Sequence, residues 1–220
     1  MADWCKIHEV EQGSADWHDL RRGKITGFRA NKLFAQNKNG SFKLSRSHTV
    51  SLIAMELMRG EKAPSGRGKP MERGHEYEAD AVLAYEFETM QETSVVGFMT
   101  VNDHPNEGAS PDRLVGDKGV LEIKVPTAIE KHVDYLRNNS HVEEYFGQLR
   151  HTLYVTGRDW IEIVSYYPEA APSLQLARKR LTRADLGMAD YPEMLTEAWA
   201  EIHARRDDLA KIQSKALEIA

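Results

Sequence analysis

Apolar residues follow two different spacings along the chain. A spacing of about 3.6 residues predicts helices over 26–34, 47–59, 71–88, 128–137, 142–154 and from about residue 191 onward. Short apolar or alternating runs predict strands over 95–101, 112–115, 120–125, 160–167 and 174–181. In the helix over 71–88, the residues expected to face the core are Tyr77, Ala81, Leu83, Ala84 and Phe87. This order of elements predicts an α/β sandwich in which helices flank a central mixed β-sheet.

The breaks between these elements are short. Residues 102–111 carry strong turn signals, and residues 60–70 are rich in Gly, Pro and Lys. We expect 60–70 to form a basic loop that either contacts the backbone of a polyanion or is simply solvated. Neither break is long enough to link two domains, and a length of 220 residues favours a single domain.

Composition excludes several classes of protein. A single cysteine, Cys5, excludes an internal disulfide, a four-cysteine zinc site and a cysteine-held iron–sulfur cluster, so we expect a reducing, cytoplasmic location. No apolar run approaches the roughly 18 residues of a membrane-spanning helix. The first residues also lack the pattern of a secretory signal. We therefore expect no membrane partner.

Charge is distributed unevenly along the chain. The net charge is −5, but residues 1–75 hold 14 Lys and Arg against 8 Asp and Glu, a balance of +6. Residues 76–220 hold 15 against 26, a balance of −11. A basic segment on an acidic body suits a surface that binds a polyanion beside carboxylates that hold cations. Chance unevenness is the alternative.

The segment 110–126 carries the most informative pattern. Two strand-like runs flank a turn over 116–119 that has glycine at both ends. A hairpin centred on Asp117 pairs residues whose numbers sum to 234, so Asp112 falls opposite Glu122, within about 5 Å at Cβ. Lys124 shares that face because side chains alternate along a strand. The residues predicted to point into the core are Leu121, Ile123 and Val125.

Carboxylates held this close repel each other unless a cation lies between them. Oxygen ligands without a nearby cysteine favour a hard ion, Mg²⁺ or Mn²⁺, and Lys124 could position or activate a water or offset charge on a phosphate. Together these groups predict metal-assisted phosphodiester hydrolysis. The alternative is an exposed cross-strand cluster of salt bridges. On the helix over 71–88, Glu78 either faces the same site or belongs to an ordinary solvated face.

Pro111 and Asp112, followed after nine residues by Glu122, Ile123 and Lys124, resemble the PD-(D/E)xK signature of the restriction-endonuclease-like nuclease superfamily. Further motifs resemble the lambda exonuclease family of viral recombination nucleases. They follow in the expected order at 11–13, 17–26, 73–81, 110–112, 121–126 and 148–156. The resemblance runs from about residue 9 to about residue 168 of a single nuclease domain. It leaves 169–220 as a C-terminal strand and helix extension.

This resemblance implies a restriction-endonuclease-like core and a 5′-to-3′ exonuclease with Mg²⁺, or Mn²⁺, at two positions per active site. Such an enzyme digests one strand of linear duplex DNA to mononucleotides and leaves 3′ single-stranded overhangs. The resemblance also implies a ring-shaped homotrimer on DNA ends, and a single-strand annealing protein of homologous recombination, as in phages, as its partner.

The resemblance also assigns roles to residues of the predicted catalytic site. The implied metal ligands are Asp112, Glu122, Glu78 and the backbone carbonyl of Ile123. Lys124 would orient or deprotonate the attacking water, and Gln148 would support the site.

A second implied site holds the 5′-terminal phosphate. Arg21 and Ser110 would bind it, because the guanidinium fork matches phosphate oxygens, and Thr26 would assist. Two residues depart from the family pattern. Phe28 stands where a small hydroxyl residue is frequent, and Arg113 stands where glycine is frequent and could add a phosphate contact.

Two other functions stay open. The same core could belong to an endonuclease or junction resolvase, which would cut a closed circular plasmid that an exonuclease leaves intact. Alternatively, the protein could be a DNA-binding scaffold whose acidic hairpin is only structural. Release of acid-soluble nucleotides from linear duplex in the presence of Mg²⁺ would exclude the scaffold.

Overall fold

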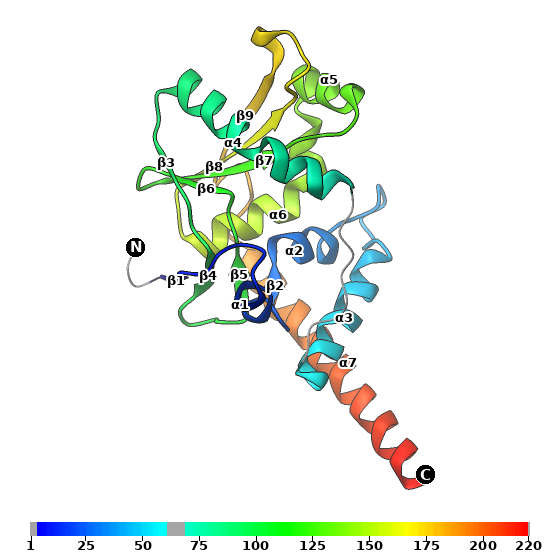
Figure 1. The fold of residues 1–220 in the computed structure, drawn as a ribbon. Helices are drawn as coiled ribbons and strands as arrows, with labels where there is room; N and C mark the ends of the chain where they lie inside the picture. The colour runs from blue at the N-terminus through cyan, green and yellow to red at the C-terminus, as the bar shows by residue number, and fades with distance from the viewer. Residues whose placement is uncertain (1–3, 61–68, 220) are drawn as a thin grey trace.

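The computed structural model describes residues 4–60 and 69–219, and its strands form two sheets (Figure 1). The four-stranded sheet has the order β1 (Cys5–His8), β4 (Phe98–Val101), β5 (Glu107–Ala109) and β2 (Ile25–Thr26). The five-stranded sheet has the order β3 (Thr93–Ser94), β6 (Arg113–Val115), β7 (Gly119–Lys124), β8 (Trp160–Tyr166) and β9 (Leu176–Thr182). Parallel pairing of β2 with β5 and of β7 with β8 makes both sheets mixed.

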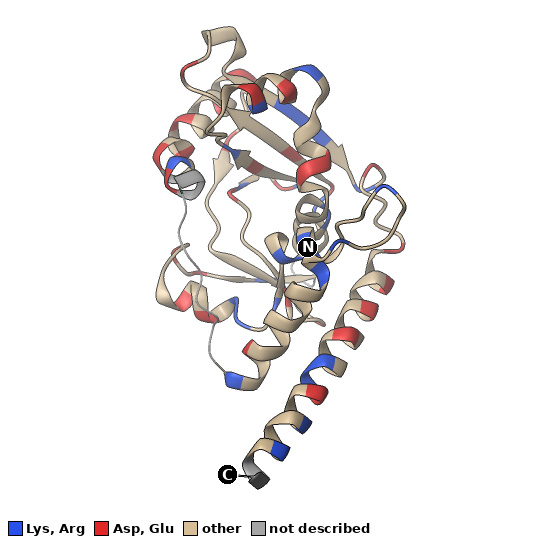
Figure 2. Cartoon of the chain, turned by 90° about the vertical axis from the view of Figure 1, so that its right-hand side faces the viewer, with Lys and Arg blue, Asp and Glu red and all other residues tan. Residues whose placement is uncertain are grey.

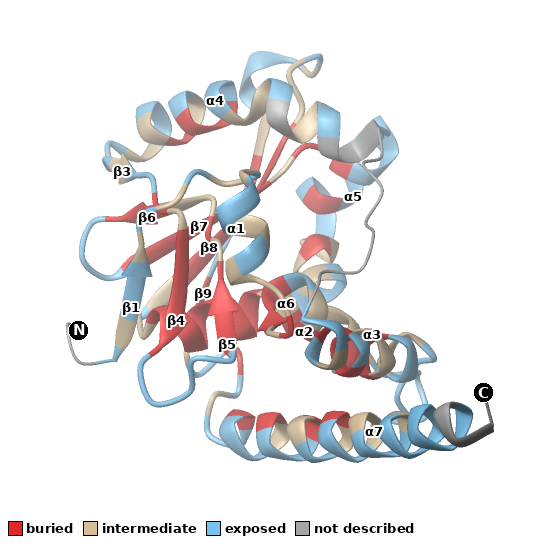
Figure 3. Ribbon diagram, turned by 60° about the horizontal axis from the view of Figure 1, so that its bottom comes forward, coloured by how far each residue is buried: buried red, intermediate tan, exposed pale blue. Residues whose placement is uncertain are grey.

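Helices cover the sheets on both sides (Figure 3). They are α1 (Ala15–Leu20), α2 (Gly27–Leu33), α3 (Ser45–Arg59), α4 (Lys69–Thr89), α5 (Ile129–Asn138), α6 (Ser140–Thr156) and α7 (Tyr191–Ile219), with a short 3₁₀ helix, η1 (Pro172–Leu174). α4 lies on one face of the five-stranded sheet, and α6 contacts β8 of that sheet as well as β4 and β5 of the other. α6 is therefore the element that joins the two sheets. The predicted fold class, a mixed α/β protein with helices around the sheet, is confirmed.

The alternation of side chains along β7 divides the core between these two helices. Leu121, Ile123 and Val125 pack with residues of α4, whereas Val120 packs with Leu149 and Leu153 of α6. The prediction that the three odd-numbered residues of this segment point into a core is confirmed. The even-numbered residues, Glu122 among them, consequently lie on the α6 side.

One predicted face of α4 is wrong in part. Leu83 and Phe87 are 64% and 84% exposed, whereas Val82 and Tyr85 are buried against the sheet. The buried face passes through Ala81 and Tyr85, four residues apart, and Leu83 lies two residues, or about 200°, away from each of them. Apolar residue types alone did not fix which face of α4 is buried, so the prediction included Leu83 and Phe87, which lie on the solvent side.

Other segments differ from the sequence prediction or lie outside the described residues. The turn predicted over 102–111 contains β5, and β1, β2 and β3 were not predicted because two to four residues carry too little pattern. Most of the predicted basic loop, 61–68 with Lys62 and Arg67, lies outside the described residues, and its Lys69 begins α4.

α7 packs along α3 and then continues beyond the body of the protein (Figure 1). Leu195, Ala198 and Ile202 are buried in the cluster that α3 and the four-stranded sheet share, and charged residues of both signs follow its length (Figure 2). In the part of the chain that the structure describes, no helix combines the length and apolarity needed to cross a membrane.

Candidate active site

The hairpin of β6 and β7 has the register predicted from its turn. Arg113 pairs with Leu121, Leu114 with Val120 and Val115 with Gly119, so the numbers of each pair sum to 234. Gly116, at the start of the turn, has a φ of +49°, which a residue without a Cβ adopts at little cost. Continuing this register by one residue brings Asp112 beside Glu122.

The side chains at this end of the hairpin contact one another. Asp112 Oδ2 accepts a hydrogen bond of 2.6 Å from the backbone N–H of Ile123. Lys124 Nζ donates to Glu122 Oε1 over 2.6 Å, and the side-chain amide of Gln148 donates to the same oxygen. Gln148 comes from α6, on the face of β7 where Glu122 is expected. The structure thus brings together four residues predicted for catalysis, Asp112, Glu122, Lys124 and Gln148.

Burial makes the charges of this cluster interact strongly. Burial, followed by the charge of Glu122, raises the pKa of Asp112 well above its usual value. For Lys124, burial lowers the pKa, but the charges of Glu122 and Asp112 outweigh burial and the net pKa is raised. The ammonium therefore stays protonated beside the acids and lies 4.4 Å from the ring centroid of Tyr145. One ammonium cannot neutralise two buried carboxylates, so Asp112 is driven toward its protonated form unless a further cation supplies positive charge.

The atoms that remain without partners fit a hard metal ion. Glu122 Oε2 is buried, and no described residue donates a hydrogen bond to it. In a strand the N–H and C=O of one residue point toward the same neighbour, so the Ile123 carbonyl lies on the side of Asp112. Carboxylate and carbonyl oxygens are ligands that Mg²⁺ and Mn²⁺ prefer. Within 4–60 and 69–219, no three His, Cys, Asp or Glu side chains gather closely enough to hold a metal by themselves.

Glu78 lies near the acids but is engaged elsewhere. It accepts a hydrogen bond of 2.6 Å from Arg113 Nη1, and its charge contributes to the raised pKa of Asp112. The sequence suggested Arg113 as a phosphate contact, but one of its guanidinium nitrogens binds Glu78. This ion pair occupies Oε1 of the Glu78 carboxylate.

The residues predicted to bind the terminal phosphate form a second cluster. Arg21 Nη1 donates to Ser110 Oγ over 3.0 Å, and Trp17 Nε1 donates to the same oxygen over 2.7 Å. The Arg21 guanidinium stacks on the Trp17 ring at 3.9 Å. Sequence reasoning missed Trp17, although a tryptophan four residues before an arginine on a helix shares its face. Thr26, by contrast, is only 2% exposed at the start of α2.

Arg21 keeps its charge without a carboxylate to neutralise it. Burial, followed by the charge of Arg29, lowers the pKa of Arg21 to about 10, so the guanidinium is still protonated at neutral pH. No Asp or Glu of the described residues lies within ion-pair distance of it. Among the described residues, its contacts are the Ser110 hydroxyl and the rings of Trp17 and Phe98. A half-buried cation with such neutral partners is suited to receive an anion.

Comparison with known proteins decides the family. The YqaJ-like viral recombinase domain matches residues 16–159, which include every residue predicted for the two clusters, from Arg21 to Gln148. The chain belongs to this family. The resemblance to recombination nucleases of the lambda exonuclease type is thereby confirmed. No curated protein matches the chain.

Solved structures share the fold of this YqaJ-type domain. The alkaline exonuclease LHK-Exo from Laribacter hongkongensis is 28% identical, with 94% of this chain and 100% of that chain covered and a TM-score of 0.78. Its complex with dAMP gives the same identity and coverage and a TM-score of 0.79. A phage-related exonuclease from Haemophilus somnus, 13% identical, shares the fold with a TM-score of 0.65 over 89% of this chain and 99% of that chain.

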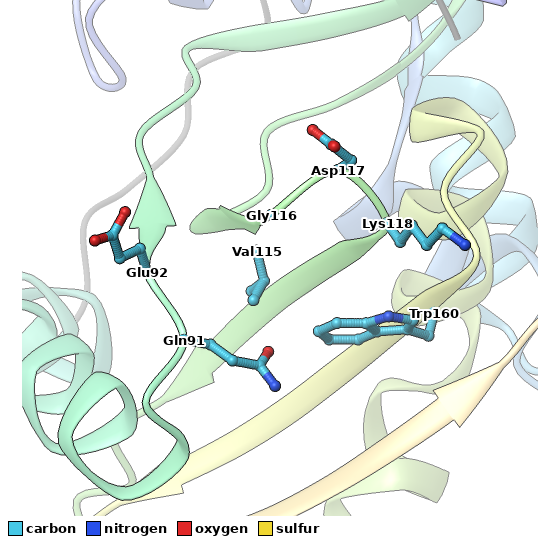
Figure 4. Close-up of a pocket in the computed structure, with 7 residues that line it drawn as sticks. All are labelled: Gln91, Glu92, Val115, Gly116, Asp117, Lys118 and Trp160. Atoms are coloured by element: carbon cyan, nitrogen blue, oxygen red, sulfur yellow. The ribbon is translucent and has the colours of Figure 1, made fainter.

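A pocket of about 490 Å³ lies at the opposite end of the hairpin (Figure 4). It is lined by Gln91, Glu92, Val115, Gly116, Asp117, Lys118 and Trp160. The Arg180 guanidinium stacks on the Trp160 ring at 3.7 Å. None of the residues predicted for the two clusters lines this pocket, so the candidate site of the YqaJ-type domain is the acidic end of the hairpin.

Proposed function

We propose that this protein is a 5′-to-3′ exonuclease that digests one strand of linear duplex DNA to mononucleotides and leaves 3′ single-stranded overhangs. Its membership of the YqaJ-like family and its likeness to an alkaline exonuclease support a nuclease. The contact of Asp112 with the Ile123 backbone and that of Lys124 with Glu122 support phosphodiester hydrolysis as the reaction.

The closeness of the two clusters along the chain supports attack at a DNA end. Ser110, which Arg21 and Trp17 contact, is two residues from Asp112, so their Cα atoms are at most about 7 Å apart. A 5′-phosphate bound at Arg21 and Ser110 would therefore position the adjacent phosphodiester at the acids. An endonuclease has no need for a terminal-phosphate site beside its catalytic residues. This adjacency is the observation that carries the proposal.

Each catalytic side chain has a role that follows from its contacts. Gln148 and Lys124 occupy Glu122 Oε1 and leave Oε2 available as a ligand. Asp112 is anchored through Oδ2 by the Ile123 N–H, and we propose Oδ1 as its ligand oxygen. Lys124 orients the attacking water and offsets charge on the phosphate, while Arg21 and Ser110 hold the end of the strand.

We propose Mg²⁺, with Mn²⁺ as a substitute, as the ion held by Asp112, Glu122 and the Ile123 carbonyl, and Glu78 as a contributor to a second position. When bound, such an ion supplies Lewis-acid stabilisation of charge on the scissile phosphate. We also propose, from the family resemblance, a homotrimer that encircles DNA, a single-strand annealing protein as partner, and a cytoplasmic location.

The proposal is tested by comparing linear duplex, labelled at either the 5′ or the 3′ end, with closed circular plasmid, with and without Mg²⁺. We expect Mg²⁺-dependent release of the 5′ label first, as a mononucleotide, and an intact closed circle. Nicking or linearisation of the circle would assign an endonuclease instead. Release of the 3′ label first would reverse the proposed polarity, and no release from any substrate would leave only a binding protein.

A further inference from the structure

A buried carboxylate lies behind the cluster of Arg21 and Ser110. Glu56 is only 2% exposed on α3, and its Oε2 accepts a hydrogen bond of 2.8 Å from the backbone N–H of Gly23. Its Oε1 accepts a hydrogen bond of 2.6 Å from Arg29 Nη2. A buried carboxylate is costly unless it is paired in this way, so Glu56 fixes both groups to α3.

Arg29 closes this set of contacts into a ring. While one of its nitrogens binds Glu56, Nη1 donates to the backbone carbonyl of Lys24 over 2.8 Å. The turn that follows α1 is thus held at Gly23 and at Lys24. Gly23 has a φ of +65°, and a Cβ there would lie 2.8 Å from Leu57 Cδ2, so this turn sits directly on α3. We call Glu56, Arg29 and their contacts to Gly23 and Lys24 the α3 clamp.

The α3 clamp holds the turn that begins at Arg21. Arg21 is two residues from Gly23, and its guanidinium reaches Ser110 across a sequence separation of 89 residues. Long arginine side chains lose rotamer entropy when they bind, so a fixed backbone lowers the cost of presenting the guanidinium. The clamp also determines the local charge. Glu56 neutralises Arg29, whereas Arg21 has no carboxylate partner among the described residues and stays available for an anion.

We propose that Glu56 is a positioning residue for recognition of a 5′-terminal phosphate. It acts through Gly23 and Arg29 on the placement of Arg21 and contacts no DNA itself. The inference rests on the proposed function for the identity of the anion. It goes beyond that function by making the preference for phosphorylated ends depend on a carboxylate of α3.

The test is binding of 3′-labelled duplex DNA, with a 5′-phosphate or a 5′-hydroxyl, measured by fluorescence anisotropy without divalent ions so that no cleavage occurs. The variants are Glu56→Gln, which removes the charge that holds Arg29, and Arg29→Lys, which keeps a charge but lacks the planar fork whose two nitrogens bind Lys24 and Glu56 separately. The matched control is Glu201→Gln, which breaks the ion pair of 2.7 Å between Arg46 of α3 and α7. Cleavage of linear duplex by the unaltered protein is measured in parallel.

We expect the unaltered protein and Glu201→Gln to prefer phosphorylated ends equally. In Glu56→Gln and in Arg29→Lys that preference falls by about tenfold, the effect of weakening one charge-assisted contact, while affinity for hydroxyl ends changes little. An unchanged preference in either folded variant, or equal loss on both kinds of end, would overturn the inference; if Glu56→Gln fails to fold, Arg29→Lys decides. If the unaltered protein cleaves linear duplex but shows no preference for phosphorylated ends, the inference is overturned and the proposed function stands. If it prefers phosphorylated ends but does not cleave, the proposed function is overturned and the inference stands.

Discussion

Unfolding at decreasing pH tests whether the buried histidine that connects α6 to the four-stranded sheet is neutral in the folded protein. His151 is fully buried, and its Nε2 lies 3.0 Å from the Ile25 carbonyl and 3.2 Å from the Gly108 carbonyl. Because carbonyls only accept, Nε2 carries the proton, and Nδ1 accepts from the Tyr191 hydroxyl over 2.9 Å. Burial lowers the pKa of His151 to about 4, from an ordinary value of 6.5.

The size of the effect follows from these two values. Between pH 6.5 and pH 4 the unfolded chain binds a proton at His151 that the folded chain does not bind. The contribution of neutral His151 to the free energy of unfolding is therefore complete above about pH 6.5 and is lost as the pH drops toward 4. Linkage gives a loss of about 2 kcal/mol at pH 5 and about 3 kcal/mol by pH 4. A loss of this size is a large part of the stability of a typical domain.

The assay is urea unfolding at pH 8, 7, 6 and 5 on the unaltered protein and on His151→Gln, which keeps a donor but does not titrate. We expect the unaltered protein to lose about 2 kcal/mol more than the variant between pH 8 and pH 5. His141, whose pKa burial also lowers to about 4, is present in both proteins and cancels. Equal pH dependence in the two proteins would refute the assignment of a neutral, buried His151.

Three further predictions concern the candidate site. Lys124→Ala and Asp112→Ala should fold and bind DNA ends but lose cleavage of linear duplex by about 10³-fold or more, as expected when a group that stabilises the transition state is removed; rates near that of the unaltered protein would contradict their roles. Gln148→Ala removes one of the two described donors to Glu122 Oε1 and leaves Lys124 as the other. It should lower cleavage by about 10–100-fold, with partial recovery at high Mg²⁺; an unchanged Mg²⁺ titration would count against it. Arg21→Ala should weaken binding of 5′-phosphorylated ends by about tenfold and leave 5′-hydroxyl ends nearly unaffected; equal loss on both ends would exclude Arg21 from phosphate binding.

The hairpin could be predicted from the sequence because its information is local. A four-residue turn with glycine at both ends fixes the register, and the period of two along a strand then fixes which side chains share a face. Asp112, Glu122 and Lys124 follow from these two rules alone. The strands of the four-stranded sheet did not follow, since β2 has two residues and owes its place to pairing with β5.

Contacts between distant segments could not be predicted in the same way. Glu56 lies on the apolar side of α3, where residue type alone would put it in solvent, and the backbone of Gly23 and the charge of Arg29 help to compensate its burial. The pairing of Glu78 with Arg113 likewise depends on how α4 crosses the hairpin. Such partners have no sequence period, because each is set by the packing of two elements far apart in the chain.

α6 explains how the two clusters are held at a fixed separation. Gln148 binds Glu122 of the five-stranded sheet, and His151, three residues later, binds the Gly108 carbonyl of the four-stranded sheet. Three residues of a helix rise about 4.5 Å, so one rigid turn of α6 fixes the two ends of the segment 108–122. Ser110 of the phosphate cluster and Asp112 of the acidic cluster both lie within that segment. A change that bends α6 between Gln148 and His151 should therefore alter both phosphate recognition and cleavage, whereas a change in either sheet alone should alter only one.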